Sequence, residues 1–95
     1  MNERIRIKPG RTVGLKMTGE ERSLVLQESL ALDEDLEAKL SRTAGDQVGL
    51  TLDELDLLAG EVAAIVGHAK DRKLRKKLDR ICDRIERLLE MFEKE

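Results

Sequence analysis

Aromatic side chains are almost absent from this chain, since Phe92 is the only one among 95 residues. Small-molecule sites and interfaces usually rely on Tyr, Trp or Phe as anchors, and single-stranded nucleic acid needs rings on which its bases can stack. The scarcity argues against a small-molecule pocket and against a surface for single strands. We therefore expect neither a small-molecule ligand nor a cofactor.

Cysteine and histidine each occur once, as Cys82 and His68. One cysteine cannot form an internal disulfide, and a structural zinc site needs four ligands, so we expect no metal site. His68 is interpreted as a helix C-terminal residue and Cys82 as a small apolar residue at the edge of a helix. No glycine-rich phosphate motif and no Gly-x-Ser-x-Gly elbow occurs. The sequence thus provides no catalytic residue, and we expect a protein that is not an enzyme.

Long apolar runs are also missing. The longest uninterrupted run of apolar residues and glycine covers 62–67, far short of the ~18–20 residues that a membrane-spanning helix needs. Residues 1–6 carry several charges but are not followed by an apolar stretch, as they would be in a signal peptide. We therefore expect a soluble, cytoplasmic protein without a membrane partner, and a length of 95 residues predicts a single domain, 1–95.

Leucine and charged residues dominate what is present. The chain has 16 leucines, 40% charged residues and a net charge of only −2. This composition favours helices that pack on helices and carry a solvated surface.

The first 18 residues alternate between apolar and polar positions. Ile5 and Ile7 form one alternating run and Val13, Leu15 and Met17 form another. The intervening 8–11, Lys-Pro-Gly-Arg, is typical of a tight turn. Residues 1–18 are therefore predicted to form a β-hairpin or a β-arch, and a similar alternation predicts a short strand over 47–52.

Helix-start signals follow the strands. Thr18 and Glu21 have the spacing of a capping box, and two short helices are predicted within 19–45. Asp53 is predicted to cap the next helix. The apolar positions of this helix extend beyond one stripe, because Leu57 and Ala64 lie outside its main inward face. A helix that is apolar on most sides is expected to be buried on most sides.

The last helix is predicted to run from 71 to about 94. Its apolar residues are spaced 4, 3, 4, 3 and 4 apart, as Leu74, Leu78, Ile81, Ile85, Leu88 and Phe92. The short break before it predicts that residues 53–94 form a long antiparallel helical hairpin. The predicted fold class is α+β and mainly helical, with a small two- or three-stranded sheet, two short helices and this C-terminal hairpin.

Two segments of the chain echo each other, 13–18 and 48–53, and both begin with Val-Gly-Leu. Similar local requirements can select similar residues. The alternative is a duplicated strand–helix unit with pseudo-twofold packing.

The leading functional hypothesis is self-association. The last helix is longer than its hairpin partner, so its end has no evident cover. The residues concerned are Leu88, Leu89, Met91 and Phe92. We therefore expect a non-enzymatic interaction module, a homodimer or a protein with another protein partner, that associates through its C-terminal helices.

A basic run provides the alternative hypothesis. Residues 70–80 contain seven cations and two acids, a net charge of +5, whereas residues 20–61 are strongly acidic. Such asymmetry can mark a small nucleic-acid-binding regulator. The candidate phosphate contacts are Arg72, Lys73, Arg75, Lys76 and Lys77. A structural alternative is a solvated helix face that pairs with the acidic half of the same fold.

Overall fold

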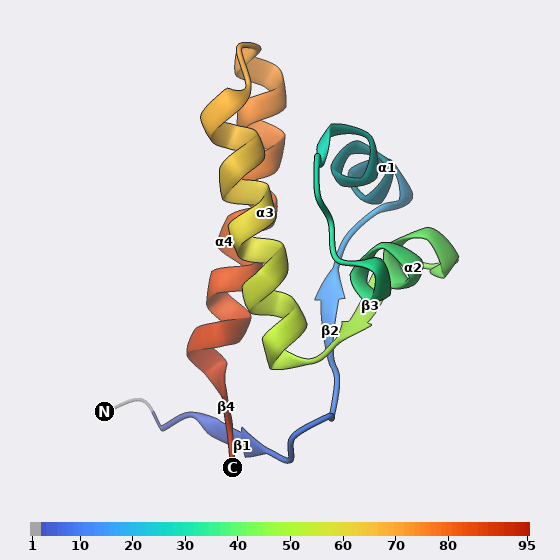
Figure 1. The fold of residues 1–95 in the computed structure, drawn as a ribbon. Coiled ribbons are helices and arrows are strands. Elements are labelled where there is room, and N and C mark those ends of the chain that lie inside the picture. The colour runs from blue at the N-terminus through green and yellow to red at the C-terminus, as the bar shows by residue number, and fades with distance from the viewer. Residues whose placement is uncertain (1–2) are drawn as a thin grey trace.

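The computed structural model describes residues 3–95 and has an α+β fold (Figure 1). Within these residues the elements, in chain order, are β1 (Ile5–Ile7), β2 (Val13–Lys16), α1 (Gly19–Glu28), α2 (Glu34–Arg42), β3 (Gln47–Leu50), α3 (Leu52–His68), α4 (Arg72–Met91) and β4 (Phe92–Lys94). The general fold class predicted from the sequence is confirmed.

The strands form two separate two-stranded sheets. β1 pairs in parallel with β4, and β2 pairs antiparallel with β3. Of the two forms predicted for residues 1–18, the hairpin is wrong, because the two strands take different partners. They belong to different sheets, as in the other predicted form, the β-arch. The turn itself is present: the Arg11 amide donates to the Lys8 carbonyl over 3.1 Å, and Gly10 has a φ of +87°. It directs the chain from one sheet to the other.

The predicted strand over 47–52 is found as β3, and its register with β2 places identical residues in equivalent positions. Gly14 lies opposite Gly49, and Val13 and Leu15 lie opposite Leu50 and Val48. The two Val-Gly-Leu segments thus pair antiparallel, and an approximate twofold axis passes between their glycines. Alternating burial follows from the strand period, since the Val and Leu side chains of both strands are buried.

α3 and α4 lie side by side and are joined by residues 69–71 (Figure 1). The prediction that the last helix continues to about 94 is wrong, because α4 ends at Met91 and Phe92 adopts extended backbone with φ −117° and ψ 148°. Phe92 pairs with Ile5 of β1 and packs against the core from there. Tertiary pairing has overridden local helix propensity at this end.

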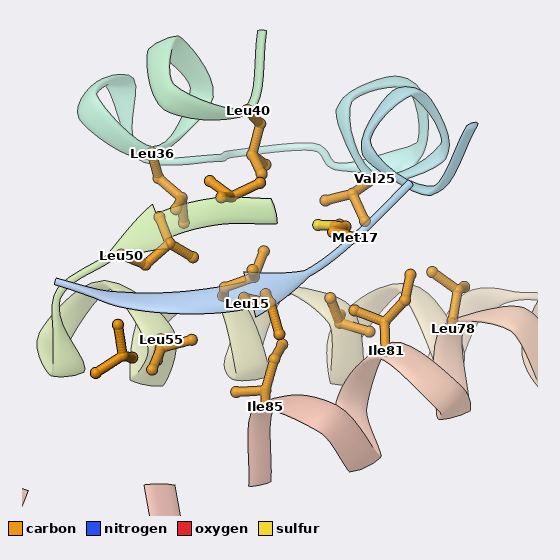
Figure 2. Close-up of a cluster of buried hydrophobic side chains, with 14 of the residues drawn as sticks. Leu15, Met17, Val25, Leu36, Leu40, Leu50, Leu55, Leu78, Ile81 and Ile85 are labelled. Carbon is orange, nitrogen blue, oxygen red and sulfur yellow. The ribbon is translucent and has the colours of Figure 1, made fainter. Parts of the chain in front are cut away.

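The core lies on both sides of the β2–β3 pair. Figure 2 shows α1 and α2 on one side of these strands and α3 and α4 on the other. The side chains that meet there are almost entirely aliphatic; the largest of the fully buried ones are Leu15, Met17, Val25, Leu36, Leu40, Val48, Leu50, Leu55, Leu58, Leu78, Ile81 and Ile85.

Candidate functional surfaces

The basic run occupies the first half of α4, on the part of the helix that faces away from the core. α4 buries Leu78, Ile81 and Ile85, while the five candidate phosphate contacts named from the sequence are all exposed. The structure therefore brings Arg72, Lys73, Arg75, Lys76 and Lys77 together within the first two turns of one helix.

The helix macrodipole does not account for these cations. The first turns of α1, α2 and α3 all carry acids, which stabilise the positive end of a helix, whereas the first turn of α4 carries none. Only the cap residue Asp71 is acidic there, and its side chain accepts a 3.0 Å hydrogen bond from the Lys73 amide. Cations at this end are locally disfavoured by the dipole.

Internal pairing accounts for one member of the run. The Nζ atom of Lys77 lies 3.2 Å from the Oε1 atom of Glu20, at the start of α1. Within residues 3–95, no carboxylate lies at ion-pair distance from Arg72, Lys73, Arg75 or Lys76. The acidic half of the fold therefore leaves four of the five candidate residues without a partner.

The C-terminal end of α4 is covered more fully than the sequence suggests. Leu88, Leu89 and Phe92 are partly buried and pack against the core, and β1 runs beside β4. Met91 alone among the four candidate self-association residues is exposed, at 53%. The β1–β4 pair therefore covers part of this end and leaves Met91 open.

α1 and α3 begin with matching capping boxes. Thr18 caps α1 and its amide donates to Glu21 over 2.9 Å. The cap of α3 is Thr51, whose amide donates to Glu54 over the same distance. The prediction that Asp53 caps α3 is therefore wrong: a threonine hydroxyl with a glutamate three residues later satisfies two backbone amides, which a lone aspartate cannot do.

Each capping glutamate is also held by a cation from another helix. Arg84 of α4 donates to Glu21 over 2.8 Å, and Lys39 of α2 donates to Glu54 over 2.5 Å. Burial alone would raise the pKa of both carboxyls, but the hydrogen bonds and the nearby cations outweigh it and hold each pKa below its ordinary value of 4.5. The same contact raises the pKa of Arg84.

Arg22 is a buried cation without a carboxylate partner. It is 7% exposed and donates to three backbone carbonyls, those of Met17, Thr43 and Gly45, over 2.8, 3.0 and 2.5 Å. These bonds tie the end of β2 to the segment that precedes β3. Sequence reasoning missed this role, because an arginine in a charged helix resembles any surface residue.

One flank of α3 is open, contrary to the expectation that this helix is buried on most sides. Leu57 is 52% exposed, and Ala63 and Ala64 are also exposed. Beside this flank, the α1–α2 connection and the second half of α3 form a groove of about 340 Å³. Its lining consists of Glu28, Leu30, Ala31, Glu61, Ala64, Ile65, His68 and Ala69.

Two further polar residues singled out from the sequence are Cys82 and His68. Burial and the neighbouring Glu86, Asp79 and Asp83 raise the pKa of Cys82, which disfavours its thiolate form. His68 is exposed as the last residue of α3. Within residues 3–95, no group of His, Cys, Asp and Glu side chains is placed to hold a metal ion.

No family model, no curated protein and no solved structure matches the chain. None of the helices over residues 3–95 combines the length and apolar character needed to span a membrane.

Proposed function

We propose that this protein is a non-enzymatic binding module that holds the phosphate backbone of a nucleic acid against the first half of α4. The observation that carries the proposal is the set of four exposed cations without an internal partner, Arg72, Lys73, Arg75 and Lys76. They stand at a helix end whose dipole also attracts anions. A bound phosphate removes the local repulsion between these cations and the dipole.

Duplex nucleic acid is the form that this surface favours. Single strands are usually held by stacking on aromatic rings, and the chain has only Phe92, which is partly buried in the core. A regular row of phosphates needs only cations at a suitable spacing. Residues 72–77 hold five cations in six positions, the densest basic segment of a chain whose net charge is −2. The proposal keeps the cytoplasmic location expected from the sequence.

Fluorescence anisotropy of labelled duplex DNA and duplex RNA tests the proposal. Affinity should fall steeply with salt, with a log–log slope of roughly −3 to −4 for four phosphate contacts on DNA. The triple variant Lys73→Glu, Arg75→Glu, Lys76→Glu should abolish binding. A matched variant, Lys8→Glu, Arg11→Glu, Lys16→Glu, makes the same charge change on exposed residues near the N-terminus and should retain it. Absence of binding at low salt, or equal losses in both triple variants, contradicts the proposal.

Self-association through the C-terminal end is a second candidate, and one observation favours it. We interpret α3 and α4 as an antiparallel helical hairpin whose far end is flanked by the β1–β4 pair. Ile5 and Met91 expose 55% and 53% of their surface there, and Ile5 pairs with Phe92, the neighbour of Met91. These two side chains could meet their counterparts in a homodimer.

Sedimentation equilibrium tests this second candidate. The double variant Ile5→Asp, Met91→Asp should dissociate a dimer. Leu88 and Phe92 are less suitable for this test, since Asp at those partly buried positions would damage the core. A wild-type protein that remains monomeric at high concentration removes the candidate.

A further inference from the structure

The groove beside α3 is lined mainly by apolar residues. Leu30, Ala31, Ala64, Ile65 and Ala69 supply its apolar lining. Leu30 is 93% exposed, the most open large apolar side chain among residues 3–95. A volume of about 340 Å³ lies near the lower limit of ligand pockets, roughly 300–1,000 Å³. The groove can therefore accept a few large apolar side chains and little more.

Two acidic residues line the same groove as these apolar side chains. Glu28 and Glu61 belong to the lining, which contains no Lys or Arg. Glu61 is fixed in place by the Ser29 hydroxyl, which donates to it over 2.8 Å. Residues 23–38, which contain the α1–α2 connection, carry five acids and no Lys or Arg. The lining thus combines apolar residues with two acids, Glu28 and Glu61, which we call the acidic rim of the groove.

One rim residue stands where its own helix disfavours it. Glu28 is the last residue of α1, whose last turn has no cation to offset the negative end of the dipole. A cationic side chain from outside would relieve that repulsion. The acids of the first turns of α1, α2 and α3 serve helix starts, but Glu28 does not, so its charge is available to a partner.

The side of α3 that faces the groove carries a small residue. Ala64 is exposed there, whereas Ala63 is turned about 100° around the helix from it and does not line the groove. Small side chains let a second helix approach a helix surface closely. A small-molecule occupant would normally be gripped by aromatic rings, and none lines this groove.

From this combination we propose that the groove binds a basic amphipathic helix of another protein. Large apolar side chains on one face of that helix fill the space between Leu30 and Ile65, and its lysines or arginines meet Glu28 and Glu61. This is the helix-in-groove mode of recognition. A second copy of the chain fits less well, since a twofold contact across this groove would bring the acidic rims toward each other.

A designed peptide serves as the probe. A fluorescein-labelled peptide of about 18 residues, long enough to be helical, carries leucines at helical spacing on one face and lysines on the rest. A second peptide replaces every lysine by glutamate. Anisotropy should show saturable binding of the leucine–lysine peptide and at least about tenfold weaker binding of the leucine–glutamate peptide, because like charges across an interface are strongly disfavoured.

Two neighbouring alanines provide matched protein variants. Ala64→Arg places a long cation in the groove and should weaken binding of the leucine–lysine peptide by about tenfold or more. Ala63→Arg makes the same change on an exposed residue outside the groove lining and should bind like the wild type. Circular dichroism and thermal unfolding of both variants establish that the fold is intact.

A second pair checks the apolar part. Leu30→Ser should weaken peptide binding, whereas Met91→Ser, at an exposed apolar residue outside the groove at the end of α4, should not. Equal effects within either pair, binding of both peptides with the same affinity, or no binding by the wild type would overturn the proposal. Sedimentation of the wild type alone covers the remaining occupant: dimerisation that Ala64→Arg removes would assign the groove to a second copy. DNA binding by Ala64→Arg should be unchanged, which separates this proposal from that for α4.

Discussion

The strand–helix units β2–α1 and β3–α3 begin in the same way and continue differently. Both start with Val-Gly-Leu, both place a threonine cap after the strand, and both use a glutamate three residues later to close a capping box. The two strands pair antiparallel, with Gly14 opposite Gly49. Each glutamate then binds a cation from a helix outside its unit, Arg84 or Lys39.

The units diverge at the fourth residue after the cap. In β2–α1 this residue is Arg22, which is buried and donates to three carbonyls, whereas in β3–α3 it is Leu55, which is buried in the core. α1 has 10 residues and α3 has 17. The long helix is held by aliphatic packing, while the short one gains a polar anchor. One local start signal therefore serves two different sources of stability.

The largest expected effect comes from making the same substitution at this divergent position in both units. Arg22→Met leaves buried carbonyls without a donor and should lower the free energy of unfolding by about 1–3 kcal/mol. Leu55→Met nearly conserves volume and shape and should cost less than about 1.5 kcal/mol. Urea unfolding measures both. Equal losses would mean that Arg22 acts only through the packing of its aliphatic part.

The capping threonines should give a smaller, matched effect. Thr18→Ala and Thr51→Ala each remove an acceptor for a helix amide and should each cost about 1 kcal/mol, within the usual range of roughly 0.5–2. Thr12→Ala, at an exposed threonine that caps no helix, is the control for both in thermal or urea unfolding. A large loss in one unit and none in the other would show that the twofold resemblance is superficial.

The smallest effect concerns pH. The folded-state pKa of Glu21 and Glu54 is lowered below 4.5, so their contribution to stability is present above that pH and is lost as the pH falls through the lowered values. Glu21→Gln and Glu54→Gln should each flatten the acid side of a plot of unfolding free energy against pH, and the double variant should flatten it further. A slope unchanged in the double variant would assign the acid sensitivity to other carboxyls.

Local signals predicted much of this fold, because they depend on residues close together in the chain. The turn at 8–11, the capping box at Thr18 and the strand at 47–50 follow from turn and capping chemistry that neighbouring residues decide. Strand partners depend on long-range packing: the pairing of Ile5 with Phe92 leaves no mark on the sequence near either residue. That pairing makes the prediction of a helix to 94 wrong, and it decides between the hairpin and the β-arch that the alternation in 1–18 left open.

The candidate surfaces divide in the same way. The basic run is visible in the letters alone, and the structure adds that Lys77 is paired whereas its four companions are not. The groove could not be predicted, because Leu30 of the α1–α2 connection and Ala64 of α3 come to line one groove only in the folded chain. A useful signal was nevertheless available, since the apolar positions of α3 outnumber those that one core-facing stripe needs.

The parallel pairing of β1 with β4 also bears on how the chain matures during synthesis. Arg6 and Glu93 are 87 positions apart and are joined by an ion pair. A ribosome makes the N-terminal part first, at about 5–20 residues per second, so β1 waits for its partner strand until residues 92–94 have left the exit tunnel. Ile5 and Ile7 remain without their partner strand until then, and the two Val-Gly-Leu strands can pair long before the β1–β4 pair closes.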